Sequence, residues 1–328
     1  MIDRNNSEPD NDLPRASTDH WEREVIEKIA MAAIVEQRRA RRWGIFFKLL
    51  FFVYVAVVSL AAFLPLSNSS IVTDGDGKHT AVVDLSGVIF DGTQANAKTV
   101  IEGLRAAVED QNTQGVIVKI NSPGGSPVQA DYIYREIRRM KQENPEMPIH
   151  AVVTDVCASG GYYVASAADK IFVNPSSLIG SIGVIMNGFG FVSAMEKLGV
   201  ERRLLIAGEH KAILDPFSPV NESEKEHIQG LLNGVHAQFI KAVKEGRGDR
   251  IKSDPDLFSG LVWTGTQSIE LGLADGEGDI RSVARDVIGA ETIVNFTPEE
   301  SFFDHFSRKF GVVLGQVFSE VAGPRLGY

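Results

Sequence analysis

Two predicted strand ends carry serine and glycine in patterns that suit acyl-transfer chemistry. The first is the run Cys157-Ala158-Ser159-Gly160-Gly161, which follows an apolar stretch at 149–157. A serine on a tight turn before a helix suits a nucleophile, because the backbone N–H groups at a helix N-terminus favour a developing oxyanion. The alternative is that Ser159 is a helix N-cap, which is a common role for serine. Taken alone, the motif favours the N-cap.

The second pattern is Asn121-Ser122-Pro123-Gly124-Gly125, which follows the apolar, β-branched stretch at 115–122. Proline fixes φ, and the glycines allow a positive φ and a close approach of the backbone. Such a turn can aim an N–H group at a bound carbonyl. An ordinary strand–helix turn accounts for the same residues equally well.

A serine nucleophile needs a base, and two neighbouring residues are candidates. Among the seven histidines only His210 merits comparison, because it follows a predicted strand, although a lone histidine there is more often structural. Lys211 comes next, in the segment GEHKAILDPF at 208–217, among apolar neighbours. A lysine accepts a proton only in its neutral form, which burial in apolar surroundings favours. The alternative is a solvated surface lysine, as most lysines are.

These motifs lie in a region where apolar, β-branched stretches alternate with amphipathic ones. The alternation predicts an α/β fold with a largely parallel sheet covered on both faces. Strands are expected at 80–89, 115–122, 149–157, 170–175, 180–185 and 201–208, and helices at 96–111, 126–144, 160–168, 191–199 and 221–248. Segments 264–273 and 279–289 are expected to close the domain, and no internal repeat divides it.

The N-terminal region predicts an uncleaved membrane anchor. The segment 49–66 contains no charged residue and is apolar on every face, unlike a core helix. A cleaved signal peptide would have a shorter basic region and a clear cleavage site. The arginines at 38–42 precede the anchor, so the positive-inside rule places the N-terminus in the cytoplasm and the rest of the chain outside it. The expected parts are a cytoplasmic tail at 1–42, a transmembrane anchor at 43–66, a linker at 67–79, an α/β domain at 80–290 and a C-terminal amphipathic tail at 291–328.

Composition narrows the classes of function. The net charge of −10 argues against a nucleic-acid binder, which would normally present a basic face. Cys157 is the only cysteine, so no intramolecular disulfide can form. No Cys/His spacing of the kind that closes a zinc site is present.

Taken together and in order, the motifs resemble the signal peptide peptidase A family, the serine peptidases of family S49. The segments are INSPGG at 120–125, ASGGYYVA at 158–165, GSIGVI at 180–185, GEHKAILDPF at 208–217 and WTGTQSIELGLAD at 263–275. The resemblance runs from about residue 80 to 290 and implies a ClpP/crotonase-like fold of repeated ββα units. One such domain fits the short form of the family and not the duplicated long form.

The resemblance also implies roles for residues and for partners. Ser159 would be the nucleophile, Lys211 the general base, and Ser181 the residue that orients the lysine. The backbone N–H groups of Gly125 and Gly160 would form the oxyanion hole, and such a dyad needs neither a metal nor a cofactor. The family forms rings or domes of subunits, and in the short form each site draws its serine and lysine from neighbouring copies. The implied substrates are cleaved signal peptides and other apolar peptides at the inner membrane.

Three other hypotheses stay open at this point. One is the periplasmic SohB sub-branch of the same family. A second is an acyl-CoA enzyme of the crotonase type, suggested by the PGG turn but disfavoured by the external location. A third is a non-catalytic membrane scaffold of the prohibitin kind, suggested by the anchor and by the expected assembly.

Overall fold

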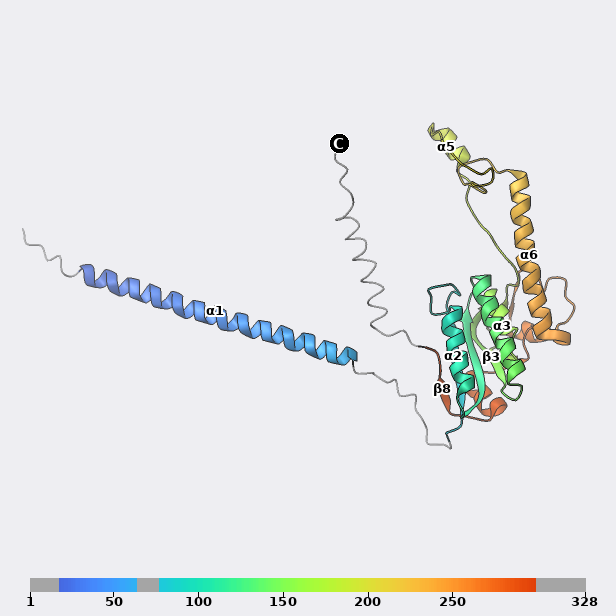
Figure 1. The fold of residues 1–328 in the computed structure, drawn as a ribbon, viewed down its shortest axis with the longest axis horizontal. Coiled ribbons are helices and arrows are strands. Elements are labelled where there is room, and N and C mark those ends of the chain that lie inside the picture. Colours follow the sequence, from blue (N-terminus) through green and yellow to red (C-terminus); the bar gives the residue numbers. More distant parts are fainter. Residues whose placement is uncertain (1–17, 64–76, 299–328) are drawn as a thin grey trace, which may run out of the picture. The chain divides into compact units, whose positions relative to one another are not determined.

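The computed structural model describes residues 18–63 and 77–298 (Figure 1). The chain divides into two compact units, residues 1–68 and residues 69–328. Most of the predicted C-terminal amphipathic tail, most of the predicted linker and the start of the N-terminal tail lie outside the described residues. Of the tail, residues 291–298 are described, and Ile293–Asn295 form a strand of the second unit.

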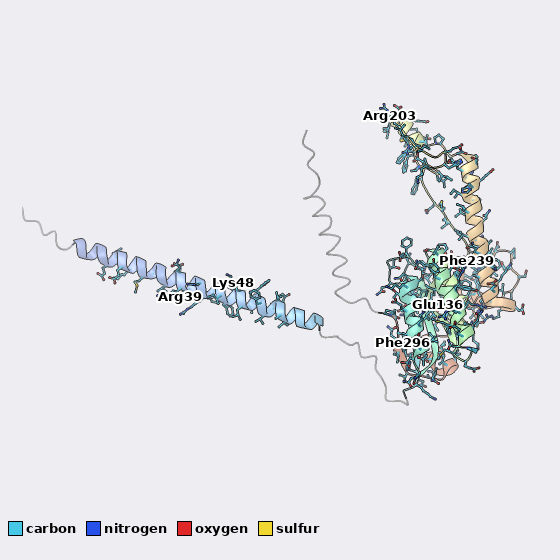
Figure 2. All side chains as sticks on the ribbon, in the orientation of Figure 1. Arg39, Lys48, Glu136, Arg203, Phe239 and Phe296 are labelled. Carbon is cyan, nitrogen blue, oxygen red and sulfur yellow. The ribbon has the colours of Figure 1, made fainter. Side chains whose placement is uncertain are left out.

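The described part of the first unit is a single helix, α1 (Thr18–Phe63). Apolar side chains such as Trp43 and Phe52 are exposed on it, and so are Arg39 and Lys48 (Figure 2). Within the described ranges, no helix combines the length and the apolar character that crossing a bilayer requires. The anchor expected at 43–66 runs past the last described residue of α1 and stays a prediction.

The second unit alternates strands with helices, as the sequence pattern predicts. In chain order its elements are β1 (His79–Ser86), α2 (Ala97–Glu109), β2 (Thr113–Ser122), α3 (Pro127–Glu143), β3 (Ile149–Ala158), α4 (Gly160–Ala165), β4 (Ile171–Val173), β5 (Leu178–Gly180), α5 (Val192–Leu198), α6 (Glu222–Arg247), the 3-10 turn η1 (Gly248–Arg250), β6 (Val262–Thr264), α7 (Gly265–Glu270), β7 (Gly276–Glu277), α8 (Ile280–Ser282), the π-helical turn η2 (Val283–Ile288) and β8 (Ile293–Asn295).

The strands form one mixed sheet in the order β6-β5-β3-β2-β1-β8; off this path, β4 pairs with β3 and β7 pairs with β4. Every pairing is parallel except that of β5 with β6. The carboxyl ends of β2 and β3 therefore meet at one edge of the sheet, so the two glycine-bearing turns that follow them lie close together.

The period-2 alternation along each strand decides which side chains face which layer. Val118 and Val153 pack into the main core under α2 and α3, whereas their neighbours Ile117 and Val152 belong to a second cluster on the opposite face. Both covering helices begin at a side-chain cap, because Asn96 accepts a hydrogen bond from the N–H of Thr99 and Ser126 accepts one from the N–H of Gln129.

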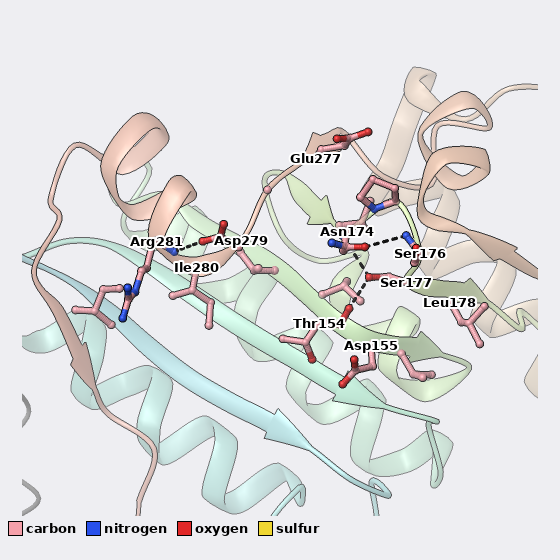
Figure 3. Close-up of a pocket in the computed structure, with 17 residues that line it drawn as sticks. Thr154, Asp155, Asn174, Ser176, Ser177, Leu178, Glu277, Asp279, Ile280 and Arg281 are labelled. Atoms are coloured by element: carbon pink, nitrogen blue, oxygen red, sulfur yellow. Dashed lines mark hydrogen bonds between the residues drawn. The ribbon is translucent and has the colours of Figure 1, made fainter.

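The opposite face is only partly covered, contrary to the expectation of helices on both faces. The short element η2 supplies Val283 and Ala284 to the second cluster, and Ile280 of α8 packs against it. Beyond them, over the carboxyl half of β3, lies an open cavity of about 1170 Å³ whose lining includes Thr154, Asn174 and Asp279 (Figure 3).

Two strand predictions were wrong. The segment expected as a strand at 180–185 contributes only its first residue, Gly180, to β5. The segment expected at 201–208 forms no strand, because no neighbouring strand lies beside it and an isolated strand leaves its N–H and C=O groups unpaired. Its apolar residues are exposed, with Leu205 at 97%.

We call residues 183–238 the arm. None of these residues, all of which the structure describes, is buried. Helix α6 belongs to the arm over its first part, while its C-terminal part packs on the body through Phe239, Ala242 and Val243. As a result α5 and the start of α6 extend away from the sheet (Figure 1).

Candidate functional site

Ser159 stands directly between β3 and α4 in an unusual backbone conformation. Its φ is 51° and its ψ is −122°, a region that non-glycine residues rarely adopt. Its N–H donates to the carbonyl oxygen of Gly180 (2.8 Å), which fixes the residue against β5. Ser159 holds the N-cap position of α4, but its side chain makes no capping hydrogen bond. The hydroxyl is therefore not committed to the structural role that the motif alone favoured.

The glycine turn after β2 lies against Ser159. A Cβ on Gly124, whose φ is +95°, would lie 2.7 Å from the backbone N of Gly160 and 2.7 Å from the Cβ of Ser159. A Cβ on Gly160 would lie 3.3 Å from the backbone N of Gly125. Only glycine permits so close an approach, and it brings the N–H groups of Gly125 and Gly160 next to each other.

These two N–H groups have no acceptor among the described residues. The turn is held from its other side, because Ile89 donates its N–H to the carbonyl of Gly124 (2.9 Å) and accepts from the N–H of Ser126 (2.7 Å). A pair of fixed donors without a partner, beside a serine hydroxyl, is the geometry that stabilises an oxyanion.

Ser181 joins the same site from the end of β5. It also has a positive φ, 52°, and its N–H donates to the carbonyl of Leu261 (2.7 Å). Ser159, Ser181, Gly125 and Gly160 all line one cavity of about 790 Å³. The structure thus brings together four of the five residues that the sequence singled out.

Lys211, the fifth, is not among the residues that line this cavity. It lies in the turn 208–217 of the arm and is exposed. Within the part of the chain that the structure describes, its Nζ makes no hydrogen bond or ion pair. His210, the other candidate base, is also outside the cavity and pairs with Glu224 (3.0 Å). A single chain therefore presents Ser159 and the two unpartnered N–H groups in a cavity that neither candidate base lines.

The walls of the cavity include residues that the sequence did not single out. Tyr163 of α4 donates from its hydroxyl to Asp131 (3.0 Å) and stacks on Phe239 of α6 (centroids 4.9 Å apart). Asp131 also pairs with Arg135 (2.7 Å). The spacing of Asp131 and Arg135 on one helix face was the only available signal, and it is common on exposed helices.

Cys157, two residues before Ser159, does not compete with it as a nucleophile. The side chain is fully buried, and burial raises the pKa of its thiol well above the usual range. Because the thiolate is the reactive form, this cysteine is inert in the folded chain. Among the described residues, no group of three or more His, Cys, Asp or Glu side chains could hold a metal ion.

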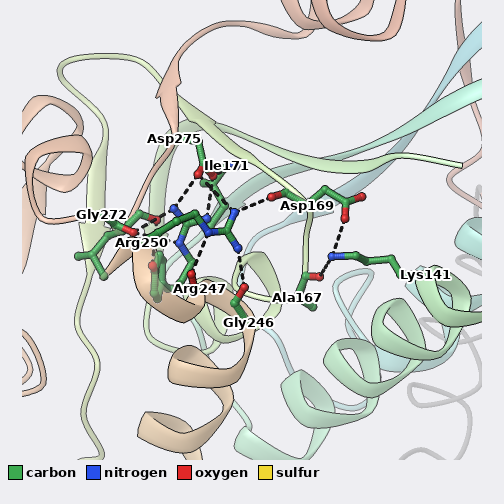
Figure 4. A network of polar contacts seen from close by, with 11 residues as sticks. Lys141, Ala167, Asp169, Ile171, Gly246, Arg247, Arg250, Gly272 and Asp275 are labelled. Carbon is green, nitrogen blue, oxygen red and sulfur yellow. Dashed lines mark hydrogen bonds and ion pairs between the residues drawn. The ribbon is translucent and has the colours of Figure 1, made fainter. Parts of the chain in front are cut away.

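The arm is anchored at its base by a buried network (Figure 4). Arg247, at the end of α6, donates to both carboxylate oxygens of Asp275 (2.7 and 3.0 Å) and to the carbonyl of Gly272. Arg250 adds a bond to Asp275 (3.3 Å) and one to the carbonyl of Asp169 (2.7 Å). These contacts fix the direction in which α6 leaves the body.

Comparison with known proteins places this site in a family. The model of peptidase family S49 matches residues 141–289, a stretch that contains Ser159, Ser181 and Lys211. A protein of Synechocystis named "Putative protease slr0021" is 31% identical over 217 residues, which cover 65% of this chain and 76% of that protein. The "Putative signal peptide peptidase SppA" of Enterococcus faecium is 32% identical over 190 residues, covering 58% of this chain and 55% of that protein.

A further relative carries a different name. A protein of Brucella abortus named "Na(+)/H(+) antiporter NhaA" is 45% identical over 213 residues, which cover 63% of this chain. The chain spans only 29% of the length of that protein, and the name describes the whole of it.

Proposed function

The chain belongs to peptidase family S49, and from that premise we propose that it is a serine endopeptidase with a Ser159–Lys211 dyad. The observation that carries the proposal is the strained backbone of Ser159 beside the unpartnered N–H groups of Gly125 and Gly160. Ser159 Oγ attacks the scissile carbonyl while Lys211 Nζ takes its proton. The two N–H groups stabilise the oxyanion, and Lys211 returns the proton to the leaving amine.

The proposal needs a second copy of the chain to supply the base. Lys211 lies outside the cavity of its own chain, and the arm that carries it exposes apolar side chains such as Ile185 (83%), Phe189 (81%) and Leu205 (97%). Exposed apolar surface of this extent is typical of an interaction site. In the proposed homo-oligomer the arm of one copy packs on the next and brings Lys211 to its Ser159, where Ser181 orients it.

The proposed substrates are apolar peptides, including cleaved signal peptides. Part of the wall of the cavity at Ser159 is apolar or aromatic and is formed by Val128, Tyr132, Val235 and Phe239. A relative that shares 32% identity is named a signal peptide peptidase. Such walls favour apolar side chains because burial in them removes apolar surface from water.

The proposed location is the inner membrane, with the peptidase domain outside the cytoplasm. Support comes from the uncharged segment 49–66 and from the arginines at 38–42 that precede it. A reporter fused after Tyr328 is expected to be active outside the cytoplasm, and activity inside it would contradict this topology. The SohB-like alternative stays open under this proposal.

The test is peptide hydrolysis by the full-length chain and its Ser159→Ala and Lys211→Ala variants. Both are expected to lose turnover, whereas the controls Ser176→Ala and Lys241→Ala, which change exposed residues outside the site, should keep it. Normal turnover by either dyad variant would refute the assignment. Acyl-CoA binding without peptidase activity would favour the crotonase alternative, and failure of a serine-reactive probe to label Ser159 would favour the scaffold.

Mixing the two inactive variants tests whether the dyad is shared. A site with Ser159 from the Lys211→Ala copy and Lys211 from the Ser159→Ala copy is complete. Random mixing should therefore restore about a quarter of the wild-type activity in a closed ring of copies. No recovery from verified mixed oligomers would place both dyad residues in one chain.

A further inference from the structure

Lys211 lies in a turn whose conformation its own side chain does not stabilise. The turn 208–217 is closed by short-range bonds, with the N–H of Lys211 donating to Gly208 (3.1 Å) and that of Asp215 donating to Ala212 (3.1 Å). No helix or strand includes it. Leu214, three residues after the lysine, has a φ of +55°, which is unfavourable for a branched side chain. The neighbouring structure must therefore hold this conformation.

Asp215 is one of the residues through which the turn is held. Its side chain is only 9% exposed, although it stands in an arm with no buried residue. Its carboxylate forms an ion pair with Arg202 Nε (2.9 Å) and accepts a hydrogen bond from the hydroxyl of Ser218 (2.7 Å). Hydrogen bonds to a charged, largely covered carboxylate are stronger than those of an exposed ion pair.

Arg202 extends this contact to a second segment of the arm. Its guanidinium lies over the ring of Phe217 (5.4 Å), and Phe217 stacks on Phe191 (5.5 Å). The N–H of Phe191 donates to the carbonyl of Pro216 (2.7 Å). The ion pair thus joins the turn that carries Lys211 to the segment on either side of α5.

We propose that Asp215, through its ion pair with Arg202, is a positioning residue for Lys211. The proposal rests on the proposed function, because it assigns Lys211 the role of base. Without the ion pair, the turn at Leu214 is free to relax and Lys211 moves relative to Ser159. A displacement of about 1 Å at a catalytic group can lower the rate about 100-fold.

The matched variants are Asp215→Asn and Arg202→Met, with Arg203→Met as the control. Arg203, labelled in Figure 2, is the next residue and pairs with Glu201 at 3.3 Å, but both side chains are open to solvent (84% and 73% exposed). In the full-length protein Asp215→Asn and Arg202→Met should each lower kcat about 10- to 100-fold with little change in KM. The KM should hold because the turn does not line the cavity of Ser159. Arg203→Met should behave as the wild type.

Two further measurements separate positioning from a merely structural role. In a Lys211→Ala background, Asp215→Asn should cause no further loss of the residual rate, since it acts only through the lysine. The double variant of Arg202 and Asp215 should lose no more than either single variant, because the two form one unit. Size-exclusion chromatography should show the same assembly for all variants.

The outcomes distinguish this inference from the proposed function. Wild-type kcat in Asp215→Asn, while Lys211→Ala is inactive, would overturn the positioning role and leave the dyad intact. Loss of activity together with loss of assembly would likewise overturn it, because the ion pair would then serve the fold. Normal turnover by Lys211→Ala would refute the dyad itself.

Discussion

Replacing Arg247 by methionine should destabilise the folded domain more than any comparable change at its surface. The guanidinium is completely buried at the end of α6, and it donates to Asp275 and Gly272 (Figure 4). Methionine fills a similar apolar volume, so the change removes the charge and the hydrogen bonds while leaving little empty space. The variant leaves the Asp275 carboxylate without its buried cationic partner.

The expected cost follows from what Asp275 retains. Breaking a buried ion pair by removing one partner typically costs about 3–5 kcal/mol. Asp275 keeps a bond from Arg250 (3.3 Å) and one from the N–H of Ile171 (2.7 Å), and its side chain is 15% exposed. These contacts place the loss at the lower end, about 3 kcal/mol.

The assay is urea unfolding of the full-length chain followed by circular dichroism at pH 7. Arg285→Met is the matched control, because Arg285 pairs with Asp286 at 2.8 Å with both side chains more than half exposed. An exposed pair contributes about 1 kcal/mol or less, so the control should unfold near the wild type. Equal unfolding free energies for the two variants would refute the reasoning that burial decides the value of the pair.

Two more predictions concern the glycine turn and acid. Gly124→Ala should lower peptide hydrolysis about 100-fold or more without unfolding the domain, because the added Cβ would push against the N–H of Gly160. Gly188→Ala is the control, since nothing lies within 4 Å of a Cβ added there. Normal turnover by Gly124→Ala would contradict the close approach of the two glycine turns. Burial opposes ionisation of Asp275, but the hydrogen bonds and charge of Arg247 outweigh it and hold its pKa below the usual range. Its stabilising contribution is therefore present above about pH 4 and is lost as the pH falls further. The difference in unfolding free energy between wild type and Arg247→Met should shrink as the pH falls below about 4, and a constant difference would contradict this linkage.

Much of the body could be predicted because its signals are local. The strands that became β1, β2 and β3 carry continuous apolar runs, and the helices between them have clear caps. Parallel strands end at the same edge, so the turns after β2 and β3 had to approach each other. Ser159, Gly125 and Gly160 came together for this reason, and the positive φ of Ser159 explains why a serine there does not cap the helix.

The arm could not be predicted in the same way. The segment 201–208 has the composition of a strand, but composition does not tell whether a partner strand is present. The same limit applies to Lys211, whose apolar neighbours in the sequence suggest burial although the residue is exposed in the single chain. In both segments the apolar residues need another surface to pack against, and the body of the same chain does not provide one.

The division of the site between body and arm has a chemical consequence under the proposed function. The oxyanion donors are already fixed in one chain by Ile89 and by the glycine turn, whereas the base is not in place. A lysine accepts a proton only when it is neutral, a form that removal from water favours. Packing the apolar arm on a neighbouring copy would exclude water and bring Lys211 to Ser159 in the same step. The rate of peptide hydrolysis per chain should then depend on how much of the protein is assembled. In a single chain Ser159 has the required backbone conformation but is inactive, because the base is missing.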